Sequence, residues 1–130
     1  MKKTFLFVCI ENSNRSQMAQ AFAKMWGGDS VIAYSAGSSP SGKINPKAIA
    51  AMAELGYDLN THDSKSLDEI PNIRYDYVVT MGCGDACPWI PAANRIDWQI
   101  PDPRDMEPEA FNTVRDLIST KVKSLIYEVN

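Results

Sequence analysis

The chain has 130 residues, a length that suits one domain and lets it bury a core of its own. Hydrophobic residues make up 45% of the chain and charged residues 22%, which excludes a disordered, collagen-like or coiled-coil protein. The net charge of −3 gives no global field for nucleic acid or an anionic membrane. We therefore expect one domain over residues 1–130, active as a monomer, that binds any anion at a local site.

The N-terminus resembles a secretion signal only faintly. Two lysines precede a short apolar run, but Glu11 follows almost at once, and no apolar run of the chain approaches the ~18 residues of a membrane span. The chain has three cysteines, and an odd number is unlike the paired framework of a secreted protein. These features favour a cytoplasmic protein with no membrane partner.

The chain alternates between short runs typical of strands and amphipathic runs typical of helices. Strands are expected over residues 4–8, 31–34, 75–81 and 96–100. Helices are expected over residues 15–26, from 46 to the stop at 56, and over 108–127. The apolar stripe of the last helix consists of Phe111, Val114, Ile118, Val122 and Leu125.

This alternation predicts the α/β class, as a single-domain, doubly wound sheet of four parallel strands flanked by helices. Ligands of such sheets bind outside the carboxyl ends of the strands. Four polar residues end or follow the predicted strands, namely Cys9, Ser35, Cys83 and Asp102. We expect these residues at one rim of the sheet.

The first motif at this rim is a cysteine, five residues, an arginine and a serine, between a buried strand and a helix. Its loop can turn backbone N–H groups toward one point beside the positive end of the helix, which suits a tetrahedral oxyanion. Arg15 can bind two oxygens of the anion in a fork, and the same field favours the nucleophilic thiolate form of Cys9. The predicted oxyanion-binding residues are Ile10, Glu11, Asn12, Ser13, Asn14, Arg15 and Ser16.

Two side chains of this loop have further expected roles. Ser16 can donate a hydrogen bond to the thiolate, and Asn12 can fix the loop through bonds to the backbone. The alternative is a buried cysteine that merely lies near a surface arginine. The strand–loop–helix context favours the active site.

The second motif is the pair Cys83 and Cys87, four positions apart in a loop. A bent loop would let the two thiols form a disulfide, and two unrelated free thiols are the alternative. A zinc site completed by Cys9 and His62 is a third interpretation, but the compact ligand pairs of zinc sites are missing. We interpret His62 as structural and assign no metal.

The third motif is Asp102, which follows the expected edge strand and stands between two prolines. A carboxyl held stiffly there can act as general acid toward a leaving oxygen. The alternative is a plain Asp-Pro turn. The expected place of Asp102 beside Cys9 favours the catalytic interpretation.

Several segments spread over nearly the whole chain together resemble one known family. They are residues 9–19, Tyr34-Ser35-Ala36-Gly37, Asn45-Pro46-Lys47-Ala48, Val78-Val79-Thr80-Met81 and Asp102-Pro103. They are similar to the arsenate reductases built on the low-molecular-weight protein tyrosine phosphatase fold. The nucleophile motif is shared with the phosphatases, whereas the extra cysteine pair points to the three-cysteine, thioredoxin-coupled reductases.

The resemblance implies reduction of arsenate to arsenite, for arsenic detoxification. Cys9 attacks arsenate held by Arg15 and the loop, and Asp102 protonates the departing oxygen. Cys83 then attacks Cys9 and releases arsenite, and Cys87 attacks Cys83 to give a Cys83–Cys87 disulfide. No cofactor is bound, because an external thiol reductant, thioredoxin in the first place, reduces that disulfide.

Two departures from the family pattern bear on this mechanism. In the best-known thioredoxin-coupled members the relay cysteines lie further apart, so glutaredoxin with glutathione is the alternative reductant. Some members bind potassium through a glutamate at the position where Gln20 stands, so no potassium site is assigned.

The main competing function is that of a low-molecular-weight tyrosine phosphatase, which hydrolyses phosphate monoesters. Such enzymes usually carry tyrosines after the Asp-Pro pair, whereas Arg104 and Asp105 follow it here, and residues 38–44 contain no aromatic side chain. A small inorganic oxyanion such as arsenate, with phosphate or sulfate as mimics, fits this rim better. A redox-sensing or oxyanion-binding module is the non-enzymatic alternative, and it would not need Asp102.

Overall fold

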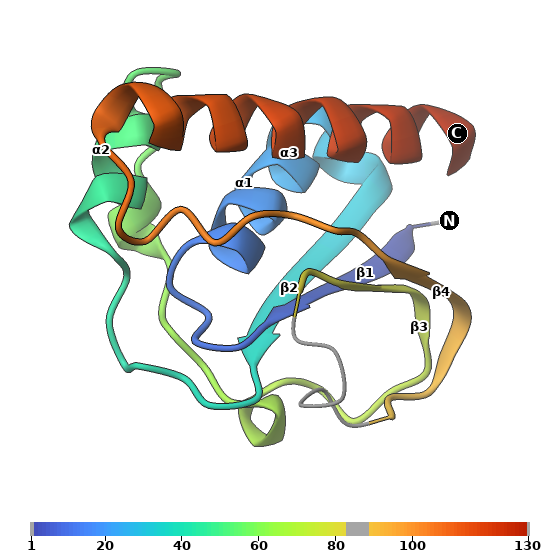
Figure 1. Cartoon of the computed structure of the whole chain (residues 1–130). Helices are drawn as coiled ribbons and strands as arrows, with labels where there is room; N and C mark the ends of the chain where they lie inside the picture. Colours follow the sequence, from blue (N-terminus) through green and yellow to red (C-terminus); the bar gives the residue numbers. More distant parts are fainter. Residues whose placement is uncertain (1, 83–88, 130) are drawn as a thin grey trace.

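The sheet is parallel and has four strands, as the sequence predicts (Figure 1). The computed structural model describes residues 2–82 and 89–129. Its strands are β1 (Lys3–Cys9), β2 (Val31–Gly37), β3 (Tyr75–Thr80) and β4 (Ala92–Asp97). They follow the order β2-β1-β3-β4, and every neighbouring pair is parallel. The predicted α/β class is confirmed.

The predicted helices are present in the described part of the chain. They are α1 (Arg15–Gly27), α2 (Pro46–Ala53) and α3 (Pro108–Val129). Short 3-10 helices, which the sequence pattern did not indicate, are η1 (Gly28–Ser30), η2 (Leu59–Thr61) and η3 (Leu67–Glu69). Asn45 caps α2 by accepting a hydrogen bond from the Lys47 backbone, and Pro46 fills the first turn.

β1 is a central strand because its side chains are apolar on both faces. Phe5 and Phe7 join the core cluster beneath α1 and α3, whereas Leu6 and Val8 pack on the opposite face. Successive side chains of a strand point to opposite faces, so an unbroken apolar run needs both faces covered. The run accordingly reaches Cys9 with no side chain more than 2% exposed.

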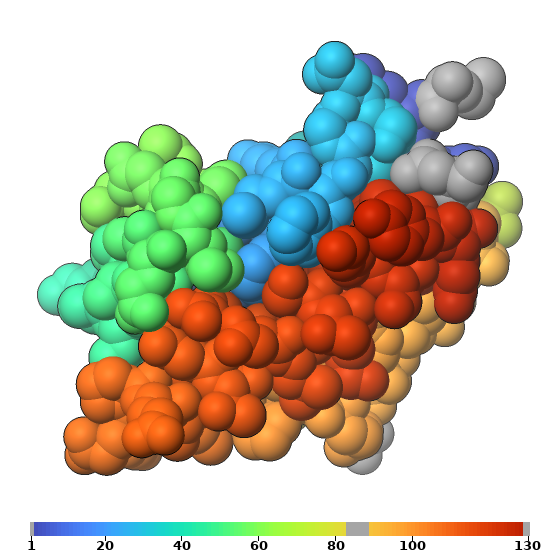
Figure 2. Space-filling model, turned by 90° about the horizontal axis from the view of Figure 1, so that it is seen from above, coloured from blue at the N-terminus to red at the C-terminus, as the bar shows by residue number. Residues whose placement is uncertain are grey.

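The larger core lies between the sheet and two helices, α1 and α3, which run side by side in Figure 2. All five stripe residues predicted for α3 are buried, and Ile126 is buried as well. α1 is buried continuously from Arg15 to Ala23, polar side chains included. Such burial of polar groups requires hydrogen-bond partners inside the fold, and these partners build the site described below.

The opposite face of the sheet has a smaller core. There Tyr75 and Val78 of β3 pack with Leu67, Ile70 and Ile90 from the segments around η3 and before β4. Among the described residues, no helix combines the length and the apolar character needed to cross a membrane.

The fourth strand differs from the prediction over residues 96–100. β4 ends at Asp97 because it follows the register of β3, in which Tyr75 pairs with Ala92 and Thr80 with Asp97. The alternation of Ile96, Trp98 and Ile100 reflects packing against the core beyond the strand end. The pairing of β4 with β3 therefore determines where the strand lies, and the alternation of apolar residues over 96–100 does not. The strand over 31–34 is also longer than expected and extends to Gly37.

The packing of α3 predicts a contrast between two adjacent residues. Ile118 is fully buried and Leu117 is 38% exposed. Ile118→Ala should lower the free energy of unfolding by about 2–5 kcal/mol, because it removes buried methyl groups and leaves a cavity. Leu117→Ala should cost less than about 1 kcal/mol. Urea titration followed by circular dichroism measures both, and equal losses would contradict this packing.

Candidate active site

The candidate site lies where β1 passes into α1. Cys9, only 2% exposed, ends the strand, and the loop over residues 10–14 leads to the helix. The segment between β4 and α3 passes beside this loop (Figure 1). A pocket of about 150 Å³ opens between them. It is lined by Cys9, Ile10, Glu11, Ser13, Asn14, Arg15, Asp102 and Arg104.

The loop carbonyls are all engaged outside the pocket. From Cys9 to Asn14, each carbonyl oxygen accepts a hydrogen bond of 2.8–3.3 Å from a neighbouring segment. The donors, in the same order, are Ser38 N, Ser39 N, Ser41 N with Ser64 Oγ, Gln17 Nε2, Asn45 N and Met18 N. The carbonyls of the loop are thus taken, which leaves its backbone N–H groups as the ones that can form a nest for an anion.

Two further features leave the site open to an anion. The N-cap of α1, Asn14, makes no side-chain capping bond, so the first N–H groups of the helix are not used by a cap. Gly37 at the end of β2 allows the loop to approach closely, because a Cβ atom there would collide with Ile10 O and Asn12 N.

Cys9 has a hydroxyl partner. Its Sγ lies 2.9 Å from Ser16 Oγ, and Asn12 Nδ2 donates a 2.8 Å hydrogen bond to the same oxygen. Because the Ser16 oxygen accepts from Asn12, its own hydrogen is free to be donated to sulfur. The expected contact of Ser16 with the Cys9 sulfur is therefore present.

Asn12 fixes the loop more extensively than expected. It is fully buried, and its φ of 51° is in the left-handed region, which is uncommon for a residue other than glycine. Its Oδ1 accepts hydrogen bonds of 2.8 Å from both Gln17 Nε2 and Lys65 N. All the polar atoms of the amide are thus bonded, which stabilises the turned conformation.

His62 supports this amide through Gln17. Gln17 Nε2 faces three oxygen acceptors, so its Oε1 must accept, and it lies 2.9 Å from His62 Nδ1. The proton of the ring is therefore on Nδ1, and Nε2 accepts from the Tyr57 hydroxyl at 2.6 Å. With both ring nitrogens engaged, His62 is structural, and the zinc alternative loses this ligand.

Burial determines the charge of His62. Loss of solvent, together with the charges of Lys24 and Lys65, lowers the pKa of His62 from 6.5 to about 4. The ring is 7% exposed and is neutral at neutral pH.

Arg15 is held from two sides. Its Nη1 donates to the Ile100 carbonyl at 3.1 Å, and its Nη2 lies 3.9 Å from Asp102 Oδ2. Gly82, which follows β3 with a φ of 86°, makes room for the guanidinium, since a Cβ atom there would collide with Nη1. The fork is therefore positioned before any ligand arrives.

Asp102 lies at the mouth of the pocket, with its side chain 44% exposed. Its Oδ1 accepts a hydrogen bond from the Arg104 backbone at 3.1 Å. Lys47 Nζ donates to the carbonyls of Arg104 and Met106, which fixes this segment to the start of α2. The structure thus brings Asp102, Arg15 and Cys9 to one pocket, as predicted.

Ser35, which was also expected at the rim, has a different place. Ser35 faces α1 instead of the pocket, and its hydroxyl donates to Gln20 Oε1 at 2.6 Å. Gln20 Nε2 donates to Ala33 O, so the amide holds β2 to α1. Cys83 and Cys87 lie outside the described residues.

Several residues that support the pocket were not predicted from the sequence. Gln17, Gly37 and Gly82 contact the site, but nothing in the local pattern marks a glutamine as a bridge. The two glycines gave the clearer signal, because Gly37 ends β2 and Gly82 comes two residues after β3. The ion pair of Glu11 with Arg104 was also missed, since the two residues are far apart in sequence.

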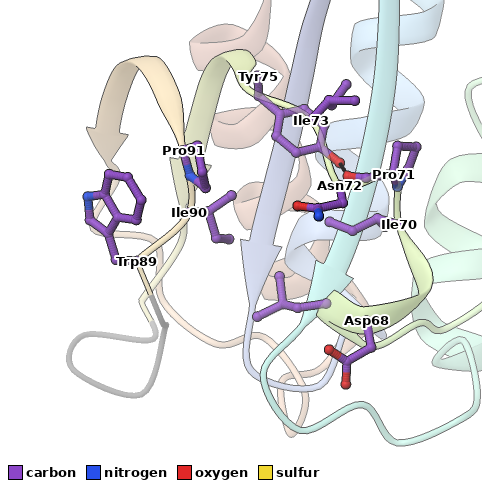
Figure 3. A pocket seen from close by; sticks show the side chains of 10 residues that line it. Asp68, Ile70, Pro71, Asn72, Ile73, Tyr75, Trp89, Ile90 and Pro91 are labelled. Atoms are coloured by element: carbon purple, nitrogen blue, oxygen red, sulfur yellow. Dashed lines mark hydrogen bonds between the residues drawn. The ribbon is translucent and has the colours of Figure 1, made fainter.

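A larger hollow of about 460 Å³ lies on the opposite face of the sheet (Figure 3). It is lined by Leu67, Asp68, Ile70, Pro71, Asn72, Ile73, Tyr75, Trp89, Ile90 and Pro91. These lining residues include no nucleophile and no cation, so the smaller pocket at Cys9 is the better candidate for an oxyanion.

The pKa of His62 predicts a pH-dependent stability. The unfolded chain binds a proton at His62 near pH 6.5, but the folded chain binds it only near 4. The contribution of neutral His62 to the free energy of unfolding is thus complete above pH 6.5. It declines as the pH falls toward 4, by at most about 3 kcal/mol. His62→Gln should lack this decline. Urea unfolding of both proteins across this range tests it, and equal pH slopes would contradict it.

Comparison with known proteins places this site in a family. Residues 4–130 match the model of the low molecular weight phosphotyrosine protein phosphatases. The chain is 38% identical over 133 residues to a glutaredoxin arsenate reductase of Synechocystis, with full coverage of both chains.

Solved structures agree with this match. An arsenate reductase in the phosphate-binding state has a TM-score of 0.90 and 37% identity, with 98% of this chain and 99% of that chain covered. A thioredoxin-dependent arsenate reductase of Corynebacterium glutamicum has a TM-score of 0.80 and 29% identity, covering 99% of this chain and 64% of that one. The chain therefore belongs to the low molecular weight phosphotyrosine protein phosphatase family and, within it, groups with the arsenate reductases.

Proposed function

We propose that the chain reduces arsenate to arsenite, with Cys9 as the nucleophile. The observation that carries this proposal is the pocket that Cys9, Arg15 and Asp102 line together, with the Ser16 hydroxyl 2.9 Å from Cys9 Sγ. The arsenate reductases among its relatives support the choice of substrate.

In the first step, the Cys9 thiolate attacks arsenic and an arsenic–oxygen bond breaks. Arg15 and the loop N–H groups hold the remaining oxygens of the anion. Asp102, at the mouth of the pocket, protonates the departing oxygen, which leaves as water. The product is a covalent adduct in which arsenic is still pentavalent.

The second step transfers two electrons. The Cys83 thiolate attacks the Cys9 sulfur, the sulfur–arsenic bond breaks, and its electron pair stays on arsenic, which leaves as trivalent arsenite. Two thiols have then become one Cys9–Cys83 disulfide. Attack of Cys87 on Cys83 returns Cys9 to the thiolate and leaves a Cys83–Cys87 disulfide for an external reductant.

The reductant is a dithiol protein of the thioredoxin type in our proposal. Three thiols in one chain and the thioredoxin-dependent relative of Corynebacterium support it. The Synechocystis relative, named for glutaredoxin, favours glutaredoxin with glutathione as the second candidate. Either reductant requires a compartment that keeps thiols reduced, so we propose that the protein acts in the cytoplasm. We also propose that it acts as a monomer.

Phosphate ester hydrolysis is the weaker candidate. Arg104 stands at the mouth of the pocket, and none of the described residues that line it is aromatic. A flat phosphotyrosine ring would have no stacking partner there. An inorganic oxyanion needs no such partner.

An assay of arsenite formation tests the function and its reductant. We expect arsenite to form when thioredoxin and its reductase are the reductant. The same assay with glutaredoxin plus glutathione as the reductant gives the comparison. Cys9→Ser should form no arsenite with either system, because a serine hydroxyl is a far weaker nucleophile and leaving group. Absence of arsenite from the parent with both systems, in a folded protein, would refute the proposal.

The two relay cysteines should give different phenotypes. Cys83→Ser should stop arsenite release, because nothing attacks the Cys9 adduct, but it should keep the low rate that the parent has on a simple aryl phosphate. Cys87→Ser should permit one turnover and trap a Cys9–Cys83 disulfide.

Peptide mapping without reductant, after a single arsenate turnover, identifies the trapped pair. Sustained thioredoxin-coupled turnover by Cys87→Ser would show that Cys87 is dispensable. Loss of both activities in folded Cys83→Ser would show that the residue is structural.

A further inference from the structure

An ion pair spans the mouth of the pocket. Arg104 Nη1 donates to Glu11 Oε2 at 2.5 Å, although the two residues are 93 positions apart. Both line the pocket, and their side chains are 53% and 34% exposed, whereas Cys9 is 2% exposed at its base. The pair therefore lies nearer the solvent than the sulfur does, at the outer rim of the pocket.

The pair connects the two halves of the site. Glu11 is two residues after Cys9, and Arg104 is two residues after Asp102. Arg104 is itself fixed, since its backbone N–H donates to Asp102 and its carbonyl accepts from Lys47 Nζ. The bridge thus has one end in the nucleophile loop and the other in the segment of the general acid.

The direction of the reaction places the leaving group at this bridge. In an in-line displacement the departing oxygen lies opposite the attacking atom. With Cys9 at the base, that oxygen points to the mouth, where Asp102 protonates it. For arsenate the leaving group is only a hydroxyl, but for an aryl phosphate it is an oxygen that carries a ring. The ring would have to occupy the space that Glu11 and Arg104 share.

We propose that the Glu11–Arg104 ion pair is the specificity determinant of this site, because it admits a free tetrahedral oxyanion and obstructs an aryl ester. The inference rests on the proposed function, since it takes Cys9 as nucleophile and Asp102 as acid. The pair also neutralises Glu11, whose carboxylate would otherwise repel an incoming dianion. Arg104 is thereby a positioning and specificity residue that does not have to touch the reacting atoms.

The test compares the binding of two anions, inorganic phosphate and phenylphosphonate. In phenylphosphonate a phenyl ring replaces one hydroxyl group of phosphate. Their dissociation constants are measured by NMR titration of the reduced full chain, which involves neither arsenate nor the relay. The parent should bind phosphate more tightly by about tenfold or more. Arg104→Ala and Glu11→Ala should each reduce this preference by about tenfold, because each removes one half of the bridge. Hydrolysis of 4-nitrophenyl phosphate should rise in the same variants relative to the parent.

Arg74→Ala is the matched control, since Arg74 is an exposed arginine directly before the N-terminal end of β3, whereas the pocket lies after the carboxyl end of the parallel strand β1. It should keep the parent preference. A parent preference near unity would overturn the proposal, and so would an unchanged preference in folded Arg104→Ala. A change in Arg104→Ala alone would overturn the role of the pair. Failure of the parent to form arsenite would refute the proposed function but would leave this ratio of affinities unaffected.

Discussion

The hydrogen bonds of one buried amide, that of Asn12, hold the site together. This side chain bonds to Ser16, Gln17 and the Lys65 backbone while its own backbone adopts a left-handed φ of 51°. An isolated loop would pay a conformational penalty for that turn and for the convergence of its N–H groups. The amide offsets the penalty with bonds that exist only in the folded chain, so the nest is formed before an anion binds.

The side chains that extend the hydrogen-bond network of this amide, Gln17 and His62, are neutral. Gln17 and the unprotonated His62 extend the network away from Cys9 without adding a charge that would compete with Arg15 for the ligand. Arg15 is the cation at the base of the pocket, and its fork is oriented by the Ile100 carbonyl. This separation keeps the electrostatic attraction for an oxyanion in one place.

The sequence predicted the elements that have strong local signals, and it predicted that Cys9, Arg15 and Asp102 lie at one place. The buried run before Cys9, the Asn45-Pro46 helix start and the stripe of α3 are local patterns, and each is present. The boundaries of β4 depend on pairing with β3, which no local window contains. Gln17 and the Glu11–Arg104 contact likewise depend on which distant segments meet, a property of the whole fold.

The bond from Arg15 to the Ile100 carbonyl also has a consequence for synthesis of the protein. The two residues are 85 positions apart, so a chain emerging from the ribosome exposes Cys9 long before the partner of Arg15 has been made. Domains of this size complete their long-range pairings only when the participating segments are available. Until Ile100 and Asp102 have been synthesised, Cys9 therefore lacks the oriented guanidinium of Arg15 and the neighbouring carboxyl of Asp102, and the pocket is incomplete.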